Sequence, residues 1–69
     1  MTKIEQVMHT LHHGDAISDE DIEFAIKTLT PVVNVLHELG PVYKLAWKEL
    51  YFDLDKFITF QKARKEKYY

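Results

Sequence analysis

Apolar residues recur every three or four positions along most of the chain, which is the spacing of amphipathic α-helices. The first such stripe consists of Ile4, Val7, Met8 and Leu11. Gly14 follows at the position where a helix commonly ends in a left-handed cap. We therefore expect a first helix over residues 3–12. A helix of about ten residues is not stable alone in water, so it must pack against another element.

The segment AISDEDIEF predicts the start of a second helix. Ser18 is a suitable N-cap, and the three acidic residues after it interact favourably with the helix dipole. Pro31 lies inside this helix, but the apolar register is the same on both sides of it. We therefore expect one helix over residues 19–39, kinked near Pro31, rather than two coaxial helices. Its core face comprises Ile22, Ala25, Ile26, Leu29, Val32, Val33, Leu36 and Leu39.

Gly40 and Pro41 predict a tight turn, because glycine ends helices and proline favours the first position of the next helix. A third helix is expected over residues 41–65, antiparallel to the second, with facing residues whose numbers sum to about 81. We expect an all-α fold forming a single domain over residues 1–69: a short N-terminal helix followed by a long antiparallel helical hairpin. The core face of the third helix comprises Tyr43, Ala46, Trp47, Leu50, Tyr51, Leu54, Phe57 and Ile58.

Both long helices also carry apolar residues on the side opposite their core faces. Large uncovered apolar patches mark interaction sites. The first helix has a single apolar stripe, which can cover these additional apolar residues on one of the long helices but not on both. We expect these residues to form a subunit interface in a homo-oligomer. The alternatives are coverage by the first helix alone, or a groove for a different partner or ligand. The residues are Phe24, Pro31, Val35, Leu45 and Phe52.

The composition favours association. A chain of 69 residues buries only about 60% of the surface that it exposes when unfolded. With 46% hydrophobic residues, it has more apolar surface than one small core can hide. Cysteine is absent, so disulfides cannot add stability. No apolar run approaches the roughly 20 residues needed to span a bilayer. The start of the chain lacks the apolar centre of a secretory signal, so we expect a cytoplasmic protein.

Charge is unevenly distributed, although the net charge is only −2. Residues 1–40 carry −5 and residues 41–69 carry +3. An antiparallel hairpin places the acidic start of the second helix beside the basic end of the third, so we expect ion pairs there. The alternative is a phosphate or membrane-surface contact through Lys62, Arg64, Lys65 and Lys67. A DNA-recognition helix would not begin with acidic residues, so nucleic acid is not an expected partner.

A histidine cluster near the end of the first helix is the strongest candidate for a metal site. His9 and His13 have the i, i+4 spacing that can place two imidazoles on one metal ion, with Glu5 one turn earlier and His12 or Asp15 as a third ligand. These histidines lie opposite the apolar stripe and near a helix C-terminus, where an imidazolium is favoured. We expect solvated histidines and no metal site.

The sequence contains no recognisable catalytic motif. The only serine is assigned to a helix cap, no Glu-x-x-His pair occurs, and the two glycines cannot form a phosphate-binding loop. We therefore expect no enzymatic activity and no cofactor. The alternative function uses Tyr43 and Trp47 to stack on a nucleotide-like ligand, with Lys44 or Lys48 binding its phosphate. An oligomer with that site would bind or sequester a small molecule.

The segment ISDEDIEFAIKTLTPVVNVLHELGPVYKLAWKEL has a further pattern: an acidic cap, an apolar helix, a Leu-Gly turn and a long charged helix. In this pattern, residues 17–63 resemble small helical accessory proteins of bacteriophages and prophages. The resemblance implies an accessory or early gene product that binds and inhibits a host factor, including host immune enzymes or their nucleotide signals, and it assigns no role to any residue. Our hypothesis is a non-enzymatic, self-associating helical protein that binds a partner macromolecule, a host protein in that case.

Overall fold

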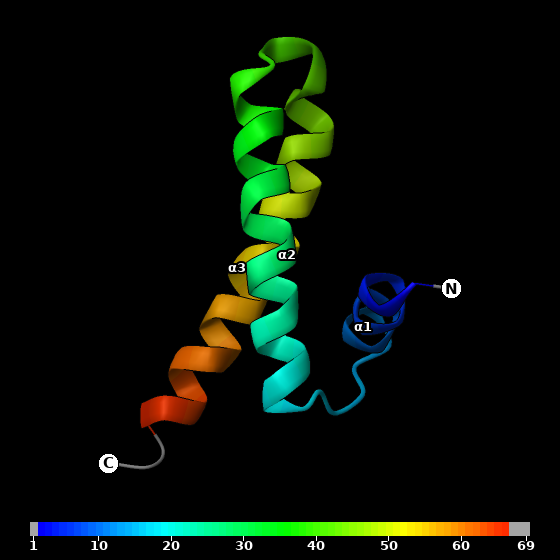
Figure 1. The fold of residues 1–69 in the computed structure, drawn as a ribbon, viewed down its shortest axis with the longest axis vertical. Helices are drawn as coiled ribbons and strands as arrows, with labels where there is room; N and C mark the ends of the chain where they lie inside the picture. The colour runs from blue at the N-terminus through cyan, green and yellow to red at the C-terminus, as the bar shows by residue number, and fades with distance from the viewer. Residues whose placement is uncertain (1, 67–69) are drawn as a thin grey trace.

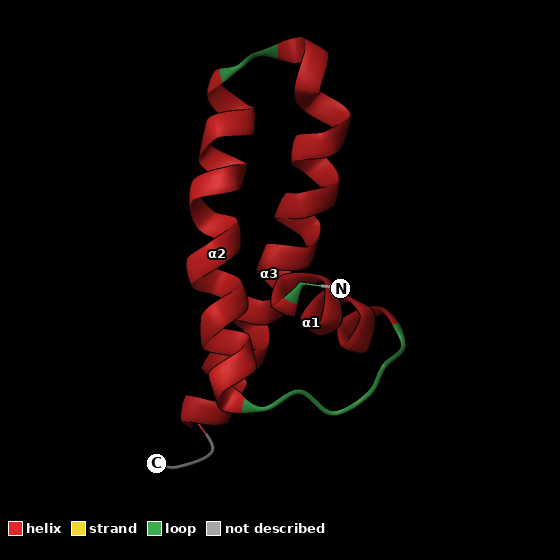
Figure 2. Cartoon of the chain, turned by 45° about the vertical axis from the view of Figure 1, so that its right-hand side comes forward, coloured by secondary structure: helices red, strands yellow, loops and turns green. Residues whose placement is uncertain are grey.

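A computed structural model describes residues 2–66 of the chain, and these form an all-α fold (Figures 1 and 2). The α-helices are α1 (Lys3–His12), α2 (Asp19–Glu38) and α3 (Lys44–Glu66), and a 3₁₀ turn, η1 (Pro41–Tyr43), joins the last two. Helices α2 and α3 pack against each other as an antiparallel hairpin, and α1 lies against the half of the hairpin that is far from the turn. The expected fold is confirmed.

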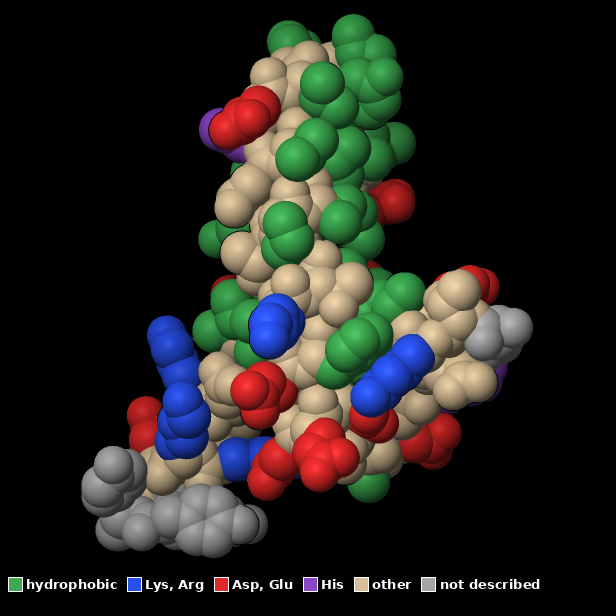
Figure 3. All heavy atoms as spheres, viewed as in Figure 1, with side chains coloured by type: hydrophobic (Ala, Val, Ile, Leu, Met, Phe, Trp, Pro, Cys, Tyr) green, Lys and Arg blue, Asp and Glu red, His purple; other side chains and the backbone are tan. Residues whose placement is uncertain are grey.

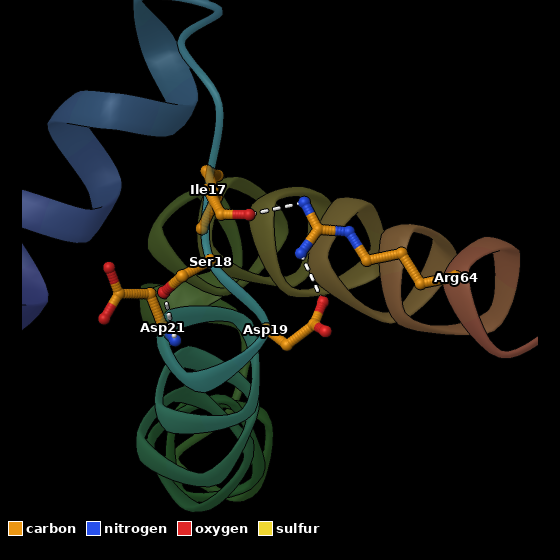
Figure 4. Close-up of polar contacts among 5 residues, drawn as sticks. All are labelled: Ile17, Ser18, Asp19, Asp21 and Arg64. Carbon is orange, nitrogen blue, oxygen red and sulfur yellow. Dashed lines mark hydrogen bonds and ion pairs between the residues drawn. The ribbon is translucent and has the colours of Figure 1, made fainter.

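Side-chain caps define where the first two helices begin. The Thr2 hydroxyl accepts a hydrogen bond from the Glu5 backbone N–H at 3.3 Å, and the Glu5 carboxylate accepts one from the Thr2 backbone N–H. This reciprocal capping box satisfies two N–H groups that have no partner inside the helix. The Ser18 hydroxyl accepts from the Asp21 N–H at 3.2 Å (Figure 4). Ser18 thus has the N-cap role predicted for it.

The turn of the hairpin is longer than the sequence pattern indicated. Gly40 has a φ of +97°, and the following residues form the 3₁₀ turn η1 before α3 begins at Lys44. The residue numbers of cross-hairpin partners therefore sum to 83 for Asp19 and Arg64 and to 84 for His37 and Trp47. The expected sum of about 81 was too low, because the centre of the bend lies beyond Gly40.

Helix α2 continues through Pro31 without interruption. Proline has no N–H to donate to the carbonyl of Lys27, one turn earlier. Immediately before it, the Thr30 hydroxyl donates to the carbonyl of Ile26 at 2.6 Å. The expectation of one helix rather than two agrees with the structure, and the kink near Pro31 stays a prediction.

The core lies entirely in the half of the hairpin that α1 covers, outside residues 34–53, and we call this part of the molecule the α1 half. No residue between positions 34 and 53 is buried. Three helices surround the core in the α1 half, whereas only two helices meet near the turn, and two helices cannot enclose an apolar side chain on all sides. The buried residues are Val7, Ile17, Ile22, Ala25, Leu29, Val33, Leu54 and Phe57.

Several residues predicted to face the core are therefore exposed. Val32 is 43% exposed, Leu39 is 56% exposed, and Tyr43 and Tyr51 are about half exposed. Ala46 is also exposed. The helical periodicity placed these residues on the correct side of each helix, but the turn-proximal part of that side has no third element against it.

Arg64 connects the basic end of α3 with the acidic start of α2 (Figure 4). Its guanidinium donates to the Asp19 carboxylate at 2.5 Å and also to the backbone carbonyl of Ile17. The ion pair expected between the start of the second helix and the end of the third is thus present. Lys67, which belongs to the alternative phosphate-binding group, lies outside the described residues.

None of the helices within residues 2–66 has the length and apolar content required to span a membrane.

Candidate interaction surface

The hairpin exposes large apolar side chains mainly near its turn. We call residues 34–53 the turn half. Figure 3 shows apolar side chains gathered over this part of the molecule, above the level of α1. An apolar surface of this extent on a small protein is typical of an interaction site. Its large exposed members are Val35, Leu39, Val42, Tyr43, Leu45, Tyr51 and Phe52, and the exposed Val32 adjoins it.

The position of α1 divides the hairpin into a covered and an uncovered part. Beside α1 lies an open hollow of about 530 Å³, which Ile4 and Met8 of α1 line together with Leu29 of α2 and Leu50 of α3. We call it the α1 hollow. Its lining is mainly apolar, although Glu5 and two histidines lie at its edge. The α1 hollow marks the point where the contact between α1 and the hairpin ends.

An apolar stripe of α2 leads out of this hollow towards the turn. Thr28, Val32, Val35 and Leu39 follow one another at spacings of four, three and four residues, so they lie along one side of the helix. Thr28 and Val32 line the α1 hollow. Exposure rises from 43% at Val32 to 54% at Val35 and 56% at Leu39. The side of α2 on which α1 packs therefore continues, uncovered, to the turn (Figure 2).

Helix α3 and the 3₁₀ turn provide the other edge of this surface. Leu50 lines the α1 hollow, Ala46 lies one turn closer to the bend, and Val42 lies one further turn along. Val42 is 88% exposed, the largest value among the exposed large apolar residues. Ala46 has a small side chain, which lets a second helix approach closely. We call the uncovered surface formed by Val32, Val35, Leu39, Val42 and Ala46 the α1 face.

A second hollow lies on α2 beside the α1 face. It has a volume of about 270 Å³ and is lined by Pro31, Val32, Val35 and Leu36. Every one of these side chains is apolar. The concavity gives the surface a shape into which a partner's side chain can pack.

The five predicted interface residues do not form one surface. Pro31 and Val35 line the hollow beside the α1 face. Leu45 and Phe52 are 73% and 61% exposed, but their spacing from the buried Leu54 places them on the opposite side of α3. Phe24 is partly buried and packs against the core. Four of the predicted residues therefore lie on two separate outer surfaces, and the fifth, Phe24, is partly covered by the α1 region.

Two lysines cover part of the predicted interface. The Lys3 ammonium lies 4.6 Å from the centre of the Phe24 ring, and the Lys56 ammonium lies 4.5 Å from the centre of the Phe52 ring. Such cation–π contacts stabilise exposed rings by about 0.5–1 kcal/mol. Each lysine stem also shields apolar surface from water. The α1 face has no such contact within the described residues, and this makes it the better candidate surface.

Sequence reasoning missed Val32, Leu39 and Val42 as surface residues, because it assigned the first two to the core. The signal that could have identified them is length. A helix of 10 residues is about 15 Å long, whereas α2 with 20 residues is about 30 Å long. One short helix therefore cannot cover the hairpin from end to end.

Of the two aromatic residues of the alternative ligand site, Trp47 stacks on Tyr51 and lies tilted against His37, whereas Tyr43 makes no such ring contact within the described residues. The Trp47 ring lies 5.3 Å from the Tyr51 ring and 5.2 Å from the His37 ring. The indole N–H of Trp47 is buried and has no hydrogen-bond partner within the described residues. Lys44 and the other basic member of the predicted site, Lys48, are exposed. The indole N–H is not accessible to a ligand in this arrangement, so this site stays a prediction.

The histidines of α1 contact different partners. The rings of His9 and His13 stack with a centroid distance of 4.0 Å. His12 instead reaches α3, where its Nε2 lies 3.2 Å from the Asp53 carboxylate. Within the described residues, no three metal-binding side chains gather closely enough to hold an ion. The contact between His12 and Asp53 joins α1 to α3 directly and so helps to fix where α1 ends along the hairpin.

A search of family models, of curated proteins and of solved structures found no match to this chain.

Proposed function

We propose that this chain is a non-enzymatic interaction protein that self-associates through the turn half of its hairpin and binds a partner macromolecule. The observation that supports the proposal is the absence of any buried residue between positions 34 and 53, in a segment with exposed large apolar side chains. In a monomer those side chains stay in water. Burying them against another protein surface is favourable by about 25 cal/mol for each Å² of apolar surface removed from water.

The fold divides the molecule into two parts with different tasks. The α1 half contains the complete core and stabilises the fold, whereas the turn half projects as a pair of helices with apolar sides (Figure 1). A helix pair of this kind presents its side chains at helical spacing, which suits packing against other helices. The resemblance to phage accessory proteins adds a narrower expectation, a host protein as the partner, which stays a prediction.

The solution mass tests this proposal. We expect light scattering to give a mass above that of one chain for the wild type and the mass of a single chain for Leu39→Glu. The introduced carboxylate would have to be desolvated in the interface, which is strongly unfavourable. Asn34→Glu is the matched control, because Asn34 is exposed on the same helix and lies away from the α1 face. A monomeric wild type at high concentration would contradict self-association.

A further inference from the structure

We propose that the α1 face is covered by a second copy of this chain, with the two hairpins antiparallel about a two-fold axis near Val35. This inference rests on the proposed self-association and specifies its surface and register. Together the two turn halves form a four-helix bundle, and an α1 half lies at each end. The charge, the exposed area and the spacing of residues along α2 and the turn all support this arrangement.

The exposed area of the chain is larger than that of a typical monomer. The accessible surface is 5413 Å², whereas a folded monomer of 8.2 kDa has about 4,500 Å². The excess of about 900 Å² is close to the roughly 800 Å² that each partner buries in a standard interface. Burial of one standard interface is thus enough to bring the exposed area of the chain to that of a typical monomer.

The charge of the turn half permits contact between two identical copies. Residues 34–53 contain three acidic side chains (Glu38, Glu49 and Asp53) and two basic ones (Lys44 and Lys48), so this segment is close to neutral. Like charges in an interface cost several kcal/mol, and a strongly charged surface would therefore favour a partner of opposite sign. A nearly neutral apolar face instead suits self-complementary packing.

The spacing of residues determines the register. In a two-fold arrangement with its axis near Val35, each residue meets the partner residue equally far from Val35 on the other side. Thr28 lies seven positions before Val35 along α2, which is about 10 Å, and the tip of the hairpin with Val42 lies on the other side of Val35, beyond the end of α2. Val42 is 88% exposed at the tip of the hairpin, and Thr28 lines the α1 hollow.

This register fills the largest of the hollows described above. The tip of each hairpin enters the α1 hollow of the other copy, where Val42 meets the apolar side chains of Met8 and Leu50. Both copies do this at once, so one contact is made twice and the assembly closes as a dimer. A tip-to-tip arrangement would leave both α1 hollows empty, and a contact through Leu45 would leave the α1 face exposed.

Cysteine crosslinking tests the register directly, because the natural chain has no cysteine. A disulfide requires Cα atoms within about 7 Å. We expect Val35→Cys to crosslink to its own copy on oxidation. Neither Val42→Cys nor Thr28→Cys should do so alone, since each lies on one side of the axis and its own copy on the other, at about 20 Å in the case of Thr28. A mixture of these two variants, one of them carrying a tag, should give a crosslinked heterodimer.

The outcomes distinguish this inference from the proposed function. If Val35→Cys has the mass of a dimer but does not crosslink on oxidation, the register is wrong and self-association remains supported. Crosslinking of Leu45→Cys or Phe52→Cys in its place would assign the contact to the other side of α3. A folded, monomeric wild type would overturn both proposals and leave the α1 face to a protein of different sequence. Circular dichroism of each variant verifies that it is folded.

Discussion

At the scale of single residues, Phe52 and Phe57 are only five positions apart, yet they have different energetic roles. Phe57 is fully buried among the core residues, whereas Phe52 is 61% exposed. Replacing a buried phenylalanine by alanine costs about 3–5 kcal/mol, through lost burial and the cavity that remains. We expect Phe57→Ala to lower the free energy of unfolding by that amount and Phe52→Ala by about 0.5 kcal/mol. Urea unfolding at low protein concentration measures both, and equal losses would contradict the packing.

Arg64 is expected to contribute more than its ion pair alone. Its partner Asp19 is exposed, so the pair itself is worth less than about 1 kcal/mol. Arg64 also donates to the carbonyl of Ile17, which lies in a part-buried contact. We expect Arg64→Ala to destabilise the fold by about 1–2 kcal/mol and Asp19→Ala by less than 1 kcal/mol, because only the first change leaves that carbonyl without its partner.

The same urea unfolding experiment compares the free energies of unfolding of these two variants. The double variant should lose little more than Arg64→Ala alone, since both changes remove the same ion pair. A larger loss for Asp19→Ala than for Arg64→Ala would show that the carbonyl contact is unimportant.

At the scale of elements, Pro31 is the residue least suited to its position. It lies inside α2 and cannot donate a hydrogen bond to the preceding turn. We expect Pro31→Ala to raise the free energy of unfolding by about 1–3 kcal/mol, part of the roughly 3 kcal/mol by which proline disfavours a helix interior. Asn34→Ala is the control, because it changes helix propensity alone and should give about 0.5 kcal/mol. A loss of stability in Pro31→Ala would mean that the surrounding structure requires the proline ring.

The bounds of the helices could be predicted from the sequence because local chemistry determines them. Ser18 caps α2 through a contact three residues away, and Gly40 ends the hairpin's first arm with a positive φ. Such interactions involve only neighbours in sequence. The start of α3 at Lys44 differed from prediction because η1 replaces the first helical turn, and no residue type distinguishes a 3₁₀ turn from an α-helical one at that position.

The surface could not be predicted in the same way, because it depends on where α1 packs. An apolar stripe of four residues fits many positions along a hairpin that is apolar throughout. Contacts such as the one between His12 and Asp53 join residues far apart in sequence, and they leave no local pattern. The sequence therefore indicated a surplus of apolar surface and placed part of it at Val35, Leu45 and Phe52, which are exposed, but it assigned Leu39 to the core and did not single out Val42.

At the scale of the whole molecule, the core occupies one half of an elongated shape with extents of 41 × 29 × 17 Å. A chain of 69 residues with its buried side chains confined to one half has little stability to spare, because small domains bury a small share of their surface. The turn half has no buried residue of its own. Its two helices are therefore the part of the fold that gains most from a second copy.

Folding and association should thus be coupled, and thermal unfolding measures the coupling. For a dimer that dissociates as it unfolds, each tenfold rise in concentration adds about 1.4 kcal/mol per dimer, or about 0.7 kcal/mol per chain. A domain of this size shifts its midpoint by about 4–8 °C per kcal/mol. We expect the wild-type midpoint to rise by about 3–6 °C per decade of concentration, and the midpoint of Leu39→Glu to stay constant. A wild-type dimer whose midpoint did not depend on concentration would instead show that the dimer dissociates below the midpoint, so that the monomer is the species that unfolds.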